Sequence, residues 1–188
     1  MSTVPKCRVV TVHLFRGDRG AIGQSVWKAL DEQKHGQGPG PSRQECLLYA
    51  GHAGVSVDSE PDLIWGFNPD LGNTPLWQAM HDLRMGAAYP AIVTDDTNVF
   101  AEAAREKLQV LTFDVIFPEP AFQAFEQKLI AERNRSQYQY SFPDGDGDCN
   151  CATWLERMAL PLISGSIDEL ASMTAASGYR RRRFGQCI

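Results

Sequence analysis

The sequence predicts a single α+β domain, residues 1–188, in which an antiparallel sheet is covered by helices. Short segments rich in strand-forming apolar residues occur at 6–15, 46–57, 63–67 and 110–117. Two other segments, 119–134 and 151–160, carry apolar residues at the spacing of an amphipathic helix. The 188 residues suffice for one domain with a full core, and they show no internal repeat and no obvious linker.

The strands are expected in the following order. Apolar residues alternate loosely over 6–15, and the breaker-rich segment 36–41 predicts a loop after it. Residues 46–57 form the second expected strand, and two glycines within it suggest a bulge or a close backbone approach. The turn-like segment 58–62 joins this strand to 63–67, so the two are expected to form a hairpin.

Helices are expected where apolar residues recur every three or four positions. They cover residues 22–30, 75–85, 97–107, 119–134, 151–160 and a segment that begins at 166. Asp96 and Thr97 are the expected cap of the third helix, and Pro161 ends the fifth. The last helix is predicted from the Ser-x-x-Glu spacing of Ser166 and Glu169, which matches a capping box.

Composition narrows the classes of partner. The net charge of −5 argues against a nucleic-acid-binding protein, whose surface would be basic, and the one basic run, 180–183, is interpreted as a solvated tail. No apolar stretch is long enough to span a bilayer, and no signal-peptide core is visible. We expect no nucleic acid and no integral membrane association. The odd number of cysteines, five, fits a reduced, cytoplasmic protein better than a disulfide framework, and any delivery elsewhere would use a route without a cleavable signal peptide.

Cys151 is the candidate nucleophile. Trp154, Leu155 and Met158 follow it at the spacing of a helix face that packs inward, and Asn150 before it is a favoured N-cap residue. A thiolate at a helix N-terminus is stabilised by the helix dipole and by free backbone N–H groups, which lower the thiol pKa and can also hold an oxyanion. A buried core cysteine is the alternative interpretation.

A reactive thiol also needs a base, most often a histidine. The chain has four histidines, at the end of the first strand, in the Gly- and Pro-rich loop, on the helix 75–85 and within the second strand: His13, His35, His81 and His52. Small neighbours leave the His52 imidazole uncovered. Period-two alternation places residues 53, 55 and 57 on the core-facing side of the strand and His52 on its other side. The His52 side chain is therefore expected to point toward the element that packs across the sheet. His52 is therefore the candidate base, and a buried structural histidine is the alternative.

These motifs occur in a recognisable order: GHAGVSV at 51–57, WGF at 65–67, the lead-in at Tyr138, and NCAT at 150–153. The order resembles the circularly permuted NlpC/P60 group of papain-like thiol enzymes, which includes lecithin–retinol acyltransferase-like proteins and domains of bacterial toxins and effectors. The resemblance covers residues 46–165, the expected catalytic core. It implies a papain-like antiparallel sheet with the nucleophile helix packed against it.

Transferred by position, the resemblance implies that Cys151 is the nucleophile and His52 the general base. The polar residue that orients the histidine is expected on the strand after it, with Asn68 as the candidate and Asp62 as the second choice. The implied activity is that of a cysteine peptidase or amidase, a thiol hydrolase that cleaves a peptide or isopeptide amide through a thioester. A lipid-directed acyltransferase of the same fold and a non-catalytic binding or metal-binding module remain open as alternatives. The expected partner is a peptide or acyl substrate, including one carried by a protein, and no cofactor is expected.

The acidic and cysteine-containing segment before the helix allows other chemistry. Asp144, Asp146 and Asp148 match the first three ligand positions of a calcium loop, but the glycine and the final glutamate of that motif are missing. Cys149 and Cys151 could ligate zinc, although their spacing is shorter than that of structural zinc sites and no second pair follows. Cys149 is also an alternative nucleophile, or a thiol that pairs with Cys151 on oxidation.

Overall fold

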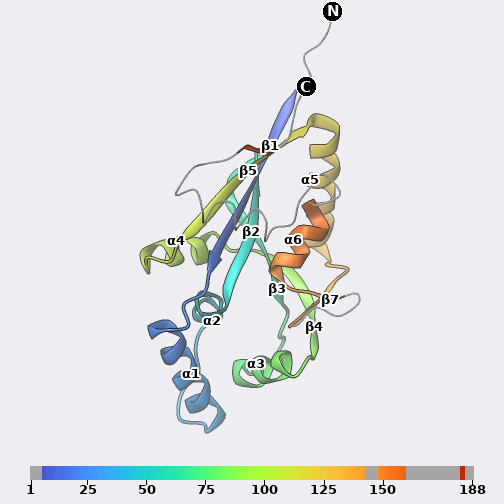
Figure 1. Cartoon of the computed structure of the whole chain (residues 1–188). Coiled ribbons are helices and arrows are strands. Elements are labelled where there is room, and N and C mark those ends of the chain that lie inside the picture. The colour runs from blue at the N-terminus through green and yellow to red at the C-terminus, as the bar shows by residue number, and fades with distance from the viewer. Residues whose placement is uncertain (1–5, 143–147, 160–182, 185–188) are drawn as a thin grey trace, which may run out of the picture.

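The centre of the molecule is a sheet whose strands come from all parts of the chain (Figure 1). The computed structural model describes residues 6–142, 148–159 and 183–184. The strands are β1 (Cys7–Arg16), β2 (Gly51–Val57), β3 (Glu60–Pro69), β4 (Ala88–Asp95), β5 (Val110–Pro118), β6 (Gln139–Ser141), β7 (Asp148–Cys149) and β8 (Arg183–Phe184). The helices are α1 (Ala21–Lys34), α2 (Arg43–Ala50), α3 (Leu76–Arg84), α4 (Thr97–Arg105), α5 (Glu119–Asn134) and α6 (Cys151–Ala159).

The sheet is antiparallel except at its two edges. Among the described residues it has eight strands in the order β7-β6-β4-β3-β2-β1-β5-β8. The six inner strands, from β6 through β4, β3, β2 and β1 to β5, pair antiparallel with one another. The two-residue strands β7 and β8 pair parallel with β6 and β5 at the edges. The predicted α+β class with an antiparallel sheet is therefore confirmed. The predicted hairpin is also present, because β2 and β3 pair antiparallel with Gly54 opposite Gly66.

One predicted strand is wrong over its first half. Residues 46–50 belong to the helix α2, and the strand β2 begins only at Gly51. The helix starts with a complete capping box in which the Ser42 side chain accepts a bond from the Glu45 N–H and the Glu45 carboxylate accepts one from Ser42 N–H. The helix ends at Gly51, whose φ of 88° is accessible to glycine but costly for other residues. These two end signals outweigh the strand-like composition of the segment.

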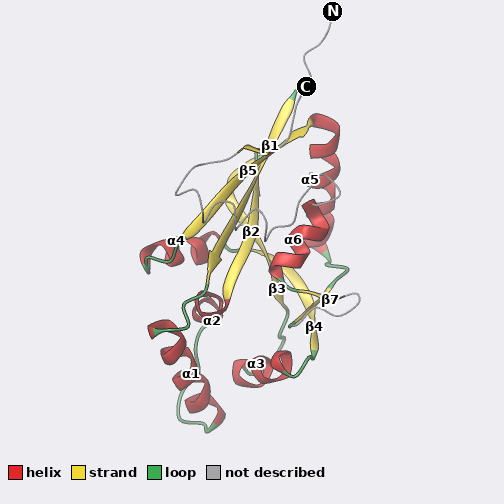
Figure 2. Cartoon of the chain, in the orientation of Figure 1, coloured by secondary structure: helices red, strands yellow, loops and turns green. Residues whose placement is uncertain are grey.

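Helices cover both faces of the sheet (Figure 2). On one face α5 and α6 pack against the alternating residues Val55 and Phe67 of the central strands, and this is the largest core cluster. On the other face Phe15 of β1 and Phe100 of α4 form a second cluster with α2. The prediction that residues 53, 55 and 57 face the core is confirmed, but the opposite face, which carries His52, is buried as well. The His52 side chain therefore lies inside the protein.

Within the described residues the other predicted elements are present, with ends that differ by a few residues, and the strands β4, β6, β7 and β8 are additional to those that the sequence predicts. Helix α5 has the predicted bounds, and residues 36–41 lie outside regular elements. The expected stop at Pro161, the capping box from Ser166 and the arginines at 180–182 lie outside the described residues, as do Asp144 and Asp146. None of the described helices combines the length and the apolar character that crossing a membrane requires.

Candidate functional site

Cys151 is the first residue of α6, as predicted. The side-chain oxygen of Asn150 accepts hydrogen bonds from the backbone N–H groups of Ala152 (3.0 Å) and Thr153 (3.1 Å), and the Thr153 hydroxyl accepts one from the Asn150 N–H (3.0 Å). This reciprocal cap holds the first turn of the helix and confirms Asn150 as its N-cap. Trp154, three residues on, is fully buried in the large core cluster, so the helix start is held from both sides.

His52 lies near the start of β2, and α6 packs against this strand and β3. Its side chain is completely buried. The ring Nε2 donates a hydrogen bond of 2.8 Å to Oδ2 of Asp96. The other nitrogen, Nδ1, has no hydrogen bond of regular geometry to any described residue. Because Nε2 is bonded to Asp96, Nδ1 is the nitrogen that remains for Cys151. The interaction with the Cys151 thiol contributes to the raised pKa of His52.

Asp96 follows directly after β4, at a position where it could cap α4. The structure shows no side-chain cap at this helix, because the carboxylate turns to His52 instead. Asn68 of β3 donates to Asp96 Oδ2 at 2.6 Å, while Arg43 of α2 and Thr94 of β4 donate to Oδ1 at 3.2 Å and 3.0 Å. Both carboxylate oxygens are therefore held by donors, which fixes the direction in which Asp96 presents Oδ2 to the imidazole.

Gly66 allows the His52–Asp96 contact to exist. This residue of β3 lies between β2 and β4, opposite Gly54 on one side and Thr94 on the other. A Cβ atom added to Gly66 would overlap the Asp96 carboxylate and would lie 2.5 Å from His52 Nε2. The hydrogen bond between the two side chains thus passes directly over the backbone of a strand, and only a residue without a side chain leaves room for it.

The electrostatics favour an ion pair between the imidazole and the thiol. Burial disfavours the charged imidazole, but the hydrogen bond to Asp96 and the interaction with Cys151 outweigh it and raise the pKa of His52 from 6.5 to about 9. Burial likewise raises the pKa of the Cys151 thiol, but His52 and the backbone N–H groups of Ala53 and Ala152 overcome this and lower it. The opposite directions of the two pKa shifts favour a thiolate–imidazolium pair over a neutral thiol and imidazole.

Asp96 stays ionised for the same reasons. Burial acts against its charge, but the hydrogen bond and positive charge of His52, followed by Asn68 and Arg43, lower its pKa below the ordinary value. Cys46 provides a contrast within the same chain. It is a free thiol buried in α2, and burial together with the nearby Glu45 carboxylate raises its pKa to about 11. The lowered pKa therefore distinguishes Cys151 from a buried thiol elsewhere in the fold.

The structure brings together Cys151, His52 and Asn68, but Asn68 is not the residue that bonds His52. The residue bonded to His52 is Asp96, and Asn68 supports Asp96 from behind. Asp62 is exposed and takes no part in this cluster. The sequence indicates Asp96 only as a helix cap. Its contact with His52 joins residues that are 44 positions apart, so no local pattern predicts it. Gly66, a glycine between two aromatic residues of a strand, was the signal for a close approach at this point.

The other thiols and possible metal ligands are placed only in part. Cys7 is disulfide-bonded, so the expectation of fully reduced cysteines is wrong for this residue, whereas Cys46 and Cys151 are free. Cys149 lies on β7, but its side chain is outside what the structure describes, and so is that of Asp148. Among the described side chains no group of three His, Cys, Asp or Glu residues is arranged to hold a metal ion.

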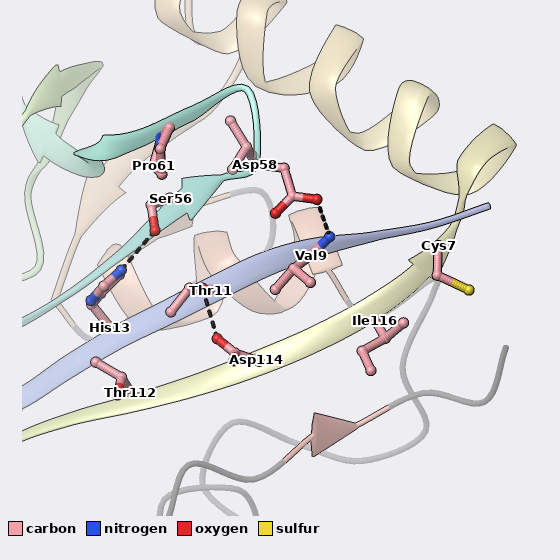
Figure 3. A pocket seen from close by; sticks show the side chains of 11 residues that line it. Cys7, Val9, Thr11, His13, Ser56, Asp58, Pro61, Thr112, Asp114 and Ile116 are labelled. Carbon is pink, nitrogen blue, oxygen red and sulfur yellow. Dashed lines mark hydrogen bonds between the residues drawn. The ribbon is translucent and has the colours of Figure 1, made fainter.

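The remaining histidines have other surroundings. His35 bonds the Asp31 carbonyl at the surface, and His81 lies on an exposed position of α3. His13 of β1 shares a hydrogen bond of 2.9 Å with Ser56 in a cavity of about 560 Å³ (Figure 3). Burial, opposed by the Asp114 charge, lowers the pKa of His13 to about 4, so its ring is neutral at physiological pH.

The cavity of Figure 3 is not lined by Cys151. Its lining includes none of the residues that hold Cys151 and His52. Comparison with known proteins adds no assignment: no family model, no curated protein and no solved structure matches the chain.

Proposed function

We propose that this protein is a thiol hydrolase that cleaves a peptide or isopeptide amide with Cys151 as nucleophile, His52 as acid and base, and Asp96 as the residue that orients His52. The observation that carries the proposal is the buried His52 ring, which bonds Asp96 through Nε2 while it and the Cys151 thiol shift each other's pKa toward an ion pair. A nucleophile beside a base that is itself oriented by a third group is the general arrangement of covalent hydrolases.

The first half of the reaction forms a thioester. The Cys151 thiolate attacks the amide carbonyl carbon, and the C–N bond then breaks. The leaving amine takes the proton that His52 carries, so the imidazolium becomes neutral as the thioester forms. Backbone N–H groups at the start of α6 lie next to the sulfur and are suited to stabilise charge at this point, as their effect on the thiol pKa indicates.

The second half restores the enzyme. Neutral His52 takes a proton from a water molecule, whose oxygen attacks the thioester carbonyl, and the C–S bond breaks to release a carboxylic acid. Throughout both halves Asp96 keeps its hydrogen bond to Nε2, so Nδ1 remains directed at the reacting atoms. The fixed carboxylate also stabilises the positive ring in the state that precedes attack.

The resemblance to permuted papain-like enzymes supports the proposal at the level of the fold. The histidine strand precedes the nucleophile helix in the chain, and that helix packs on the central strands of an antiparallel sheet. The resemblance also keeps lipid-directed acyl transfer as the second candidate within the same chemistry, since a thioester can pass its acyl group to an acceptor other than water.

The first experiment measures the reactivity of Cys151. Intact protein is treated with iodoacetamide at pH 7, and alkylation of Cys151 and Cys46 is followed by mass spectrometry of the peptides, with a short unstructured cysteine peptide as reference. We expect Cys151 to react roughly 10-fold or more faster than the reference, because a thiol with a pKa near 8.5 is only a few per cent ionised at pH 7. Cys46 should react more slowly than the reference. In His52→Ala the Cys151 rate should fall to that of the reference or below.

The second experiment asks what the thioester is transferred to. Protein is incubated with a peptide-amide library in ¹⁸O-labelled water, and in parallel with phosphatidylcholine vesicles and a primary amine. Hydrolysis places one ¹⁸O atom in a new carboxylate, whereas acyl transfer produces an N-acyl amine without label. Cys151→Ala should abolish either product. If Cys151 reacts no faster than the reference peptide and neither product forms, the enzymatic proposal is wrong and a binding function takes its place.

A further inference from the structure

A second pocket lies beside the start of β2. It has a volume of about 300 Å³ and is lined by residues from three helices and two loops: Arg19, Trp27, Tyr49, Ala50, Met80, Arg84 and Phe142. The aromatic rings of Trp27 and Tyr49 meet edge to face at 5.7 Å, and Met80 is buried in a core cluster against which Tyr49 packs. This volume is at the lower end of the range for small-molecule and side-chain sites.

The charged residues of this pocket are all positive. Arg19 and Arg84 are its charged lining residues, and neither forms an ion pair with a described carboxylate. The Arg84 guanidinium lies over the Trp27 ring, 4.9 Å from its centre, which holds the cation at the pocket wall. The chain as a whole carries a net charge of −5, so an all-cationic pocket does not follow from its composition. Arginines of this kind recognise carboxylates through directed, charge-assisted hydrogen bonds.

One wall of the pocket is close in the chain to the candidate base, His52. Ala50, one of its walls, ends α2 two residues before His52, and two peptide units span at most about 7 Å. Phe142, at its other side, packs against the same core cluster as Cys151.

We propose that this pocket is the specificity subsite of the Cys151 site and that it binds a carboxylate next to an apolar group, so that the preferred substrate is a peptide that carries a carboxylate beside the scissile bond. The inference rests on the proposed function. The aromatic and methionine surface receives the apolar part, and Arg19 and Arg84 bind the carboxylate. Two chemical sources carry this combination, the free C-terminus of an apolar residue and the side chain of an acidic residue, and the experiment separates them.

The experiment compares thiol-directed probes that differ only in charge. One pair is N-chloroacetyl-phenylalanine and its primary amide, which reports on a terminal carboxylate. The other is the α-amide of N-chloroacetyl-glutamate and that of N-chloroacetyl-glutamine, which reports on a side-chain carboxylate. In each probe the Cys151 thiolate displaces chloride and forms a thioether. The second-order rate of Cys151 alkylation is measured in wild type, in the double variant Arg19→Gln/Arg84→Gln, and in Lys28→Gln.

We expect the acid of one pair to react about tenfold faster than its amide, the factor that corresponds to one net charge-assisted hydrogen bond. The preference should disappear in the double variant and persist in Lys28→Gln, which removes a positive charge from the exposed surface of α1 outside the pocket. The pair that shows the preference identifies the source of the carboxylate. Equal rates for acid and amide in both pairs, or a preference that survives the double variant, would overturn the proposal.

Binding without alkylation keeps this inference distinct from the proposed function. The corresponding N-acetyl compounds are titrated into Cys151→Ala and followed by NMR. Preferential binding of the acid, lost in Arg19→Gln/Arg84→Gln, supports an anion site even if Cys151 proves to be an ordinary thiol, in which case the proposed hydrolase alone is refuted. Preferential binding that leaves the alkylation rate of a reactive Cys151 unchanged would refute the assignment of the pocket to this site.

Discussion

Replacing Gly66 by alanine should break the site without touching any of its polar residues. The new Cβ atom would overlap the Asp96 carboxylate and lie 2.5 Å from His52 Nε2, so the hydrogen bond between them cannot persist in its present geometry. Both side chains are almost fully buried, at 0% exposure for His52 and 3% for Asp96. Separating a buried charged pair costs about 3–5 kcal/mol, and we expect a loss near the lower end, about 3 kcal/mol, because the ring retains the option of tilting away.

The effect on the thiol follows from the same contact. The hydrogen bond to Asp96 is the largest cause that raises the pKa of His52, and the imidazolium in turn lowers that of Cys151. Without it the pKa of the Cys151 thiol rises and the thiolate fraction falls; for comparison, an ordinary thiol with a pKa near 8.5 is only roughly 3% ionised at pH 7. The alkylation rate of Cys151 should therefore fall by up to about 30-fold relative to a fully ionised thiol.

The matched control is Gly54→Ala, at the residue directly opposite on β2. Its Cβ would also be crowded, at 2.8 Å from Ile64 and 3.2 Å from Phe100, but it would not meet His52 or Asp96 closely. The assay combines urea denaturation with peptide-resolved alkylation, in which modification of the buried Cys46 reports any unfolding. A folded Gly66→Ala protein with the wild-type Cys151 rate, or an equal loss of rate in Gly54→Ala, would refute the reasoning.

Three further results are expected. Cys151 should be alkylated with half-maximal rate at a pH below the usual thiol value of about 8.5, because the thiolate is the reacting form and its pKa is lowered, and His52→Ala should move this midpoint upward; an unchanged midpoint contradicts the ion pair. In Asp96→Asn the His52 pKa, followed by NMR of the ring protons, should fall from about 9 by at least one unit, and a value that stays near 9 would show that Asp96 is not its main partner. Ser42→Ala should lower the free energy of unfolding by about 1 kcal/mol in urea denaturation, because the capping box with Glu45 is lost, and no change would show that α2 does not depend on it.

Local features of the site could be predicted from the sequence because they depend on neighbours in the chain. Asn150, Cys151 and the apolar residues that follow specify a capped helix with the thiol at its start, and the structure has this helix. The alternation along β2 likewise identified the core-facing residues correctly. The incorrect strand prediction for residues 46–50 also concerns local features. Leu and Tyr occur in strands and helices alike, and the capping box at Ser42 is the local signal that specifies the helix.

The identity of the histidine's partner was decided only by the tertiary structure. His52 and Asp96 are 44 residues apart, and they meet because β2, β3 and β4 lie side by side in a register that sets Gly66 between them. Asn68 lies on β3, the strand next to that of His52, as expected. The carboxylate that bonds His52 comes instead from Asp96, directly after β4, and Asn68 bonds this carboxylate. By itself the sequence determined a helix that presents a thiol and a strand that presents an imidazole. Pairing across three strands decided what orients the imidazole, because the choice of neighbouring strands depends on tertiary contacts between segments that are far apart in the sequence.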